Sequence, residues 1–389
     1  MMHNSQQRIL TTHTGSLPRP RPLLDLLIRQ ERGEAIDQGA FDRLAEESVK
    51  NVIAKQLTAG IDIGNDGEQP RSGFAGYVTQ RMKGFGGGAE RPPWQDFIDF
   101  PDFAELMQQR ITNLKLAATF TTPQAIAEIQ YTDLSAATQE CDLFLRCAQA
   151  QPQQFTDRFM TAVSPGMVAT YHVNAYYDSH ENYVFAVAKQ LKKEYELIHA
   201  KGLLLQIDAP DLACDHAWFF KHLSVQEFQK VVESNIAAIN LAIENIPADR
   251  VRLHTCWANF EAPHVHDIAL EKILPILYQA KVGALSVELA NPRHQHEYAV
   301  FKHYPLPDSM VVIPGVIDPK TNYVEHPQVV ANRILQTVEA VGDRSRVIAG
   351  VDCGFSTVAG FQFVADSVVW AKLRTLREGA DLASAKLWG

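Results

Sequence analysis

The sequence predicts an α/β fold, a single (β/α)8 barrel of the TIM type with an insertion between its second and third strands. Eight short apolar runs rich in β-branched residues recur along the chain, and helical segments separate the later runs. Strands that alternate with helices form parallel sheets, and eight such units favour closure into a barrel over an open sheet. We therefore expect residues 1–389 to form one barrel domain.

The predicted strands are short, and each gives way to a polar or glycine-containing turn. They span residues 9–16, 60–68, 159–166, 203–210, 251–257, 285–292, 310–318 and 346–354. The predicted helices show apolar residues at helical spacing. They span residues 181–202, 224–245, 266–281 and 326–342.

The segment of about residues 69–155 breaks this alternation. Its sequence is typical of a hairpin-like excursion that is followed by helices before the third barrel strand. Long segments between barrel strands commonly lie over the functional end of the barrel. We interpret this segment as a lid over the barrel mouth, and not as an independent domain.

Composition excludes several classes of protein. The chain is 46% hydrophobic and 21% charged, as in ordinary soluble globular proteins, and its net charge of -9 without a basic run argues against nucleic-acid binding. No run of about twenty apolar residues is present, so no membrane span is expected. The amino terminus lacks a signal core, and five cysteines fit a reducing compartment, so we expect a cytoplasmic protein.

Four residues that can bind a metal ion stand where a predicted strand ends. His254 and Cys256 lie in the fifth run, Glu288 in the sixth and Cys353 in the eighth. The carboxyl ends of barrel strands meet at one rim, so these side chains are expected to converge there. Because His254 and Cys256 are two residues apart on a strand, they point the same way. An imidazole, a carboxylate and two thiolates suit zinc.

Each of these residues alone is better explained as an ordinary buried residue, and the coincidence of four at one rim favours the zinc site. Two pairs of histidines also have metal-like spacing, but they follow the strand ends in polar turns, and we interpret them as solvated loop residues. These pairs are His264 with His266 and His294 with His296. The other cysteines are predicted to be structural: Cys141, Cys147 and Cys214.

Several motifs together resemble one enzyme family. HTCW at 254–257, the isolated Glu288, DCG at 352–354, TTHTGSLPRP at 11–20 and QIDAPDL at 206–212 look like the catalytic half of cobalamin-independent methionine synthase. The segments WANFEAPH, ANPRHQHE and GVIDPKTNYVE resemble the single-barrel members of that superfamily, which also contains epoxyalkane:coenzyme M transferases. The resemblance covers most of the chain and implies a zinc enzyme that activates a thiol for alkylation.

The resemblance also implies a site for an amino acid substrate. Gly15 and Ser16 match the turn that holds the carboxylate of homocysteine, and Glu68 and Asp208 match the two carboxylates that bind its ammonium group. A helix cap is the structural alternative for Asp208. The implied activity is a zinc-dependent S-methyltransferase that binds homocysteine as a zinc thiolate and methylates it to methionine. The hypothesis is that homocysteine sulfur displaces water or the weakest protein ligand, for which Glu288 is the candidate. A site that stayed closed with all four protein ligands would instead be structural.

The methyl donor is less well specified by the resemblance. The chain is about the size of one barrel, so we expect it to lack the amino-terminal half of the two-half enzyme. Lys320 stands where that enzyme has an acid histidine, which makes it a candidate proton donor or a plain surface residue. Arg91, in a segment with two prolines, resembles part of the donor site. A donor of the 5-methyltetrahydrofolate type is favoured, and a methylcorrinoid protein or another small methyl carrier stays open.

Two other functions stay open. Alkyl transfer to a different thiol, such as coenzyme M, would leave Glu68 and Asp208 unpaired, because a sulfonate thiol has no ammonium group. A barrel that only binds or senses a metal would need no substrate residues. The sequence does not specify an oligomeric state.

Overall fold

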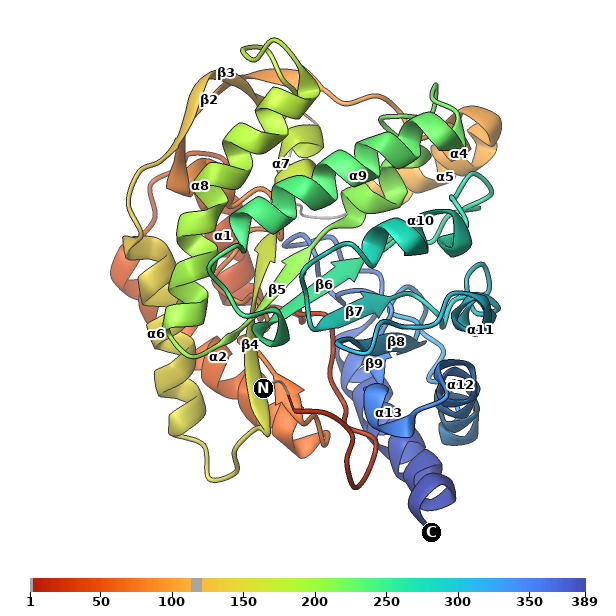
Figure 1. Cartoon of the computed structure of the whole chain (residues 1–389). Coiled ribbons are helices and arrows are strands. Elements are labelled where there is room, and N and C mark those ends of the chain that lie inside the picture. The colour runs from red at the N-terminus through yellow and green to blue at the C-terminus, as the bar shows by residue number, and fades with distance from the viewer. Residues whose placement is uncertain (1–2, 113–120) are drawn as a thin grey trace.

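The computed structural model describes residues 3–112 and 121–389. Seven parallel strands of this part of the chain form a curled sheet in the order β1-β4-β5-β6-β7-β8-β9 (Figure 1). Their bounds are β1 Ile63–Gly64, β4 Asp157–Val163, β5 Leu204–Asp208, β6 Val251–Thr255, β7 Ala284–Val287, β8 Val311–Ile317 and β9 Gly350–Val351. Each strand overlaps one of the runs that the sequence predicts.

Two helices, α1 and α2, precede β1, and from β4 onward a helix follows each strand along the chain, with α8 to α13 on the outer side of the sheet (Figure 1). The α-helices are α1 Arg21–Glu31, α2 Gln38–Thr58, α3 Val78–Arg81, α4 Gln95–Asp99, α5 Pro101–Thr112, α6 Ser135–Gln149, α7 Pro165–Tyr171, α8 His180–Ala200, α9 Val225–Ala242, α10 Leu270–Leu277, α11 Val300–His303, α12 Pro327–Val341 and α13 Asp366–Trp388. Short 3₁₀ helices span Pro210–Leu212, Cys214–His216, Ala248–Arg250, Glu297–Ala299 and Arg344–Arg346. The four helices predicted from periodicity correspond to α8, α9, α10 and α12.

The first predicted strand is represented by isolated bridges between residues 11–12 and both edges of the sheet. Thr11 pairs in parallel with Ala349, next to β9, and Thr12 pairs in parallel with Ile63 of β1. A small core cluster lies inside the curl, because only there can residues from both edges meet. It contains Leu10, Ile63, Phe159, Leu204, Ala284, Ile313 and Ile348. The sheet thus resembles a TIM barrel with seven assigned strands, and the eighth strand stays a prediction.

Between β1 and β4 the chain forms an antiparallel hairpin of β2 (Met82–Glu90) and β3 (Thr121–Tyr131), with α4 and α5 between its two strands. The sequence predicts helices after such a hairpin. One helix, α6, does follow it, and the structure also places α4 and α5 between its two strands. The pairing is long-range, since Met82 pairs with Tyr131 and Glu90 with Thr121 across the intervening segment. The lid function of residues 69–155 stays a prediction.

The parallel sheet brings the carboxyl ends of its strands to one edge, where Glu68, Asp208, Glu288, Lys320 and Cys353 each end or closely follow a strand. Among the described residues, no helix is both long and apolar enough to traverse a bilayer. The fold therefore brings these residues, which come from segments far apart in the chain, to one edge of the sheet.

Candidate metal centre and substrate cavity

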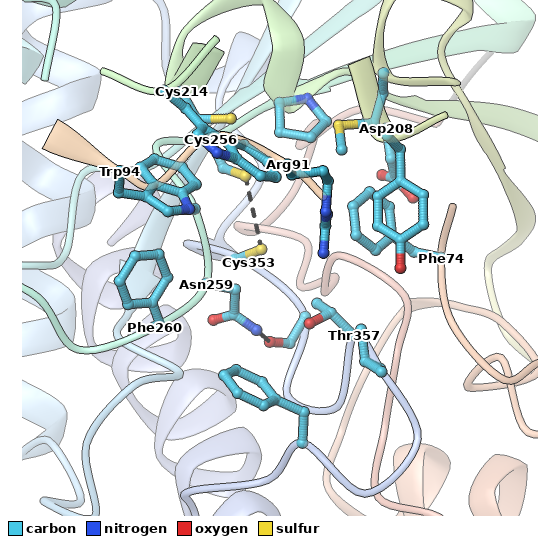
Figure 2. A pocket seen from close by; sticks show the side chains of 18 of the residues that line it. Phe74, Arg91, Trp94, Asp208, Cys214, Cys256, Asn259, Phe260, Cys353 and Thr357 are labelled. Carbon is cyan, nitrogen blue, oxygen red and sulfur yellow. Dashed lines mark hydrogen bonds between the residues drawn. The ribbon is translucent and has the colours of Figure 1, made fainter. Parts of the chain in front are cut away.

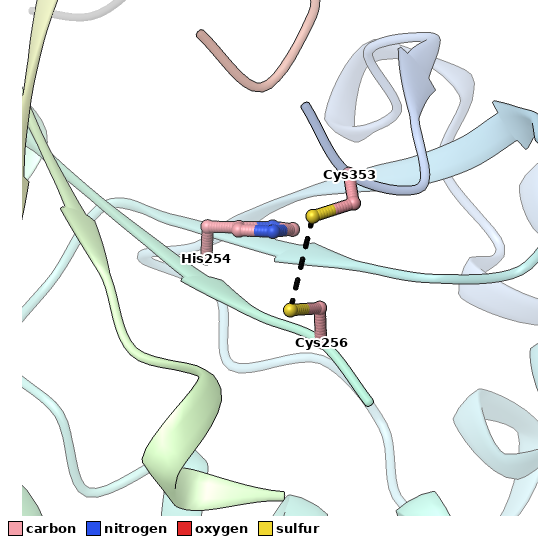
Figure 3. Close-up of side chains that lie close together, drawn as sticks. All are labelled: His254, Cys256 and Cys353. Atoms are coloured by element: carbon pink, nitrogen blue, oxygen red, sulfur yellow. Dashed lines mark hydrogen bonds between the residues drawn. The ribbon is translucent and has the colours of Figure 1, made fainter. Parts of the chain in front are cut away.

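His254, Cys256 and Cys353 lie together at the carboxyl edge of the sheet (Figure 3). His254 belongs to β6, Cys256 directly follows this strand, and Cys353 follows β9. Their candidate ligand atoms all lie within 4.8 Å of one another, and the two sulfur atoms are 3.9 Å apart. All three residues are buried. The structure thus brings together three of the four predicted metal ligands.

The donor atoms of this group fit a divalent metal ion. Burial lowers the pKa of His254 to about 3, and the nearby charge of Arg252 adds to this effect, so the imidazole is neutral. Its Nδ1 lies 3.3 Å from Ser286 Oγ, whereas its Nε2 is buried without a hydrogen-bond partner among the described residues. A neutral imidazole with one nitrogen unpaired, next to two thiols, is a donor set that suits zinc.

Cys353 is the donor in the hydrogen bond between the two sulfur atoms, so its thiol carries a proton when no cation is present. The hydrogen bond between Cys353 and Cys256 raises the pKa of Cys353 well above its ordinary value, and burial raises it further. Because a bound cation favours thiolates, the same pair would lose its protons on metal binding. Metal affinity is therefore expected to fall as the pH is lowered.

Glu288, the fourth predicted ligand, lies outside this group and has other partners. One oxygen, Oε2, accepts hydrogen bonds from Lys320 Nζ at 2.9 Å and from Asn291 Nδ2 at 2.8 Å. The other oxygen, Oε1, accepts from the backbone N–H of Trp257 at 3.3 Å. Glu288 is fully buried, so these donors compensate a carboxylate that has lost its water. In this structure it stabilises the loop after β6 and Lys320.

Lys320, the candidate proton donor, is a buried partner of Glu288. Burial alone would lower the pKa of Lys320, but the charges of Glu288, Asp352 and Asp318 raise it above its ordinary value. A lysine that donates a proton near neutral pH needs the opposite shift. The observed pairing with Glu288 therefore supports a structural role for Lys320, and it is not the surface residue that the sequence left open, because only 9% of it is exposed.

A cavity of about 570 Å³ opens next to the candidate metal ligands (Figure 2). This volume is in the range of small-molecule sites. The predicted residues that line it are Ser16, Glu68, Arg91, Asp208, His254, Cys256 and Cys353. Candidate ligands for the metal, the amino acid and the methyl donor thus share one cavity.

Glu68 and Asp208 bring two carboxyl groups into this cavity. Both are buried. Burial raises the pKa of Asp208 well above its ordinary value, and the nearby charge of Glu68 contributes to this rise. Burial also raises the pKa of Glu68, against the lowering effect of Arg71 and Arg19. Two carboxyl groups that disfavour each other's ionisation are suited to receive a cation.

Sequence reasoning missed the aromatic wall of the cavity. The rings of Trp94 and Trp218 stack with their centroids 4.7 Å apart, and Phe260 meets Trp94 edge to face at 5.3 Å. The guanidinium of Arg91 lies 4.5 Å from the ring centroid of Tyr171 and 5.0 Å from that of Trp218. These residues come from segments far apart in the chain, and of them only Arg91 was a candidate from the sequence.

Two histidines that we interpreted as solvated are buried. His294 lies between Asp267 and Glu297, with distances of 2.9 Å from Nε2 and 2.8 Å from Nδ1, and its ring stacks on Trp257. Burial lowers the pKa of His294, but its two carboxylate partners outweigh this effect and raise it to about 9. His264 also pairs with Asp267, at 2.9 Å. The interpretation as solvated residues was therefore wrong for these two, because carboxylate partners compensate their burial. One partner of each lies three residues along the chain, and Asp267 also reaches His294 from 27 positions away.

The remaining weaker candidates are the other two histidines and three cysteines, and they differ in how far they are buried. His296 is exposed and His266 partly exposed, as expected for loop residues. Cys141 and Cys147 are buried in α6, in agreement with a structural role. Cys214 is also buried, but it lines the cavity.

Comparison with known proteins agrees with the resemblance seen in the motifs. No family model matches the chain. It is 24% identical to the 2-hydroxypropyl-CoM lyase of Xanthobacter autotrophicus, over 97% of this chain and 96% of that protein. It is also 24% identical to a methionine synthase of Thermococcus kodakarensis, over 97% of this chain and 94% of that protein. The chain therefore has homologues of both names along nearly its whole length.

A solved structure has a similar fold. The B12-independent methionine synthase from Shewanella sp. W3-18-1, in complex with selenomethionine, superposes with a TM-score of 0.74 at 18% sequence identity. The match covers 98% of this chain and 99% of that chain. At this identity the likeness shows the fold alone, which the two chains share over nearly their whole length.

Proposed function

We propose that this chain is a zinc-dependent S-methyltransferase that methylates homocysteine to methionine. One observation carries the proposal: a single cavity joins the group of His254, Cys256 and Cys353 to the carboxyl groups of Glu68 and Asp208. A thiol that also bears an ammonium group is the substrate class that needs both features. The methionine synthase relatives support this choice.

In this proposal, His254, Cys256 and Cys353 hold the metal. Three protein ligands are typical of catalytic zinc sites, whereas structural sites have four. A bound zinc ion supplies acidity, because it makes a thiol lose its proton at neutral pH. Lys320 keeps Glu288 engaged at 2.9 Å, outside the ligand group.

A second set of residues, outside the metal group, orients the amino acid substrate. Glu68 and Asp208 receive its ammonium group, and the Gly15–Ser16 turn receives its carboxylate through the backbone N–H and the hydroxyl of Ser16. Charge-assisted contacts of this kind contribute about 1.5–3 kcal/mol each when they are sheltered. The substrate sulfur then faces the methyl donor. In the transfer a carbon–sulfur bond forms, and the bond between the methyl group and the donor breaks with its electron pair leaving on the donor.

The methyl donor is proposed to be of the 5-methyltetrahydrofolate type. The stacked pair of Trp94 and Trp218 offers an apolar surface to a flat ring, and Arg91 offers a cation to an acidic group. A methylcorrinoid protein is the alternative. An assay of methionine formation from homocysteine with each donor in turn distinguishes the two donors.

Alkyl transfer to coenzyme M is the second candidate, because one relative is a 2-hydroxypropyl-CoM lyase. Calorimetry of the zinc-loaded protein with each thiol separates the two functions. We expect homocysteine to bind at least about tenfold more tightly than coenzyme M, since the sulfonate thiol leaves Glu68 and Asp208 without a cation. Binding of coenzyme M alone would reject the homocysteine assignment.

Gly15 provides a sharper test of the amino acid site. Its φ is 142°, and a Cβ atom at this position would lie 2.6 Å from Thr161 Cγ2 and 2.9 Å from Glu68 Oε1. Gly15→Ala is therefore expected to displace Glu68 and to weaken homocysteine binding by about tenfold or more. Calorimetry measures the loss, and Gly33→Ala, at a positive φ but with open space around it, is the matched control. Unchanged binding in Gly15→Ala would exclude this turn from the site.

A further inference from the structure

Glu68 has one oxygen fixed by the protein and one directed elsewhere. Its Oε1 accepts a hydrogen bond from the hydroxyl of Thr161 at 3.0 Å. Its Oε2 is buried and has no hydrogen-bond partner among the described residues. Glu68 lines the cavity, and its backbone has a positive φ of 54°. A buried carboxylate oxygen without a donor is costly, so it is suited to a donor that the ligand brings.

A hydrogen bond from Arg71 fixes the direction in which the hydroxyl of Thr161 donates. Arg71 Nη1 donates to the backbone oxygen of Thr161 at 3.0 Å and to its Oγ1 at 3.2 Å. A hydroxyl has one hydrogen, and because Oγ1 already accepts from Arg71, that hydrogen is directed to Glu68.

Arg71 is itself rigid. Its Nε and Nη2 donate to the two oxygens of Glu140 at 2.6 Å and 3.0 Å, and both side chains are buried. A bidentate pair of this kind fixes the plane of the guanidinium. The chain of contacts from Glu140 through Arg71 and Thr161 to Glu68 therefore has no solvent-exposed link.

We propose that Thr161 is a positioning residue that, by orienting Glu68, makes the cavity select thiols that carry an ammonium group. This inference rests on the proposed function. Thr161 touches no substrate atom itself; its hydroxyl keeps Oε1 engaged so that Oε2 faces the ammonium group. Asp208 is oriented separately, because its Oδ1 accepts from Gln206 Nε2 at 2.8 Å. Loss of the Thr161 hydroxyl therefore weakens ammonium recognition without abolishing it.

The test compares two thiols on three proteins. Zinc-loaded wild type, Thr161→Val and Thr161→Ser are titrated calorimetrically with homocysteine and with 4-mercaptobutanoate, which lacks the ammonium group. In Thr161→Val the backbone contact with Arg71 remains, so the charge of Arg71 stays in place. We expect about a tenfold loss of homocysteine affinity in Thr161→Val, no change for 4-mercaptobutanoate, and restored selectivity in Thr161→Ser, which keeps a hydroxyl.

Each other outcome overturns a defined statement. Equal weakening of both thiols in Thr161→Val, or no weakening, would overturn the positioning role, because a merely structural residue does not discriminate between the two ligands. A folded Thr161→Ser that behaves like Thr161→Val would also overturn it, and thermal unfolding of each variant checks the fold. If wild type itself binds the two thiols equally, the proposed homocysteine function fails, and the inference fails with it.

Discussion

Replacing Cys353 by serine is expected to abolish stable zinc binding and, with it, methyl transfer. The variant removes one of two sulfurs that lie 3.9 Å apart in a group of three candidate ligands. A serine hydroxyl remains protonated at neutral pH and is a poor ligand for zinc. We expect the zinc affinity to fall by more than about 100-fold, since residues that only orient metal ligands already change affinity by 10–100-fold. Competition with a chromophoric chelator measures this change.

The matched control is Cys147→Ser. Cys147 is equally buried but lies in α6, outside the metal group. The Cys147→Ser variant should therefore retain about one equivalent of zinc. Wild-type affinity in Cys353→Ser would remove the basis of the proposed site. Growth of a methionine auxotroph on the wild-type gene but not on the Cys353→Ser gene would in addition count against a barrel that only senses metal.

Most of the fold could be predicted from the sequence because its signals are local. A strand of a parallel barrel is a short apolar run, and the seven assigned strands fall within or at the edge of predicted runs. The segment between β1 and β4 could not be predicted in this way. Its hairpin pairs residues 82–90 with 121–131 around two helices, and long-range pairing leaves no mark on local periodicity.

The same distinction between local and long-range signals explains which parts of the site could be predicted. His254, Cys256 and Cys353 were predictable, because their residue types and their places at strand ends both carry information. The partner of Glu288 was not, since Lys320 is 32 positions away and nothing in its neighbourhood shows that it is buried. The interpretation of His294 was wrong for a related reason. A polar turn sequence does not show that the histidine is buried or that it contacts Asp267 and Glu297. Compensation of buried charge is a property of the folded arrangement.

Removing the ammonium group of Lys320 is expected to destabilise the protein strongly. Lys320 and Glu288 form a buried ion pair at 2.9 Å, with 6% and 0% of their side chains exposed. In Lys320→Met, Glu288 stays buried with only the weaker donors Trp257 N–H and Asn291. Breaking a buried pair by removing one partner costs about 3–5 kcal/mol. Urea unfolding of metal-free protein, in the presence of chelator, measures the loss.

The double variant Lys320→Met with Glu288→Gln identifies the cause of that loss. If an uncompensated charge is responsible, removing the carboxylate as well should recover most of the stability, because a neutral amide costs less to bury. Lys302→Met is the surface control, since its pair with Glu339 is exposed and should leave stability unchanged. A loss below about 1 kcal/mol in Lys320→Met would show that the pair is not closed in solution. Glu288 would then be available to the metal, and the fourth ligand that the sequence predicts would become the better description of the site.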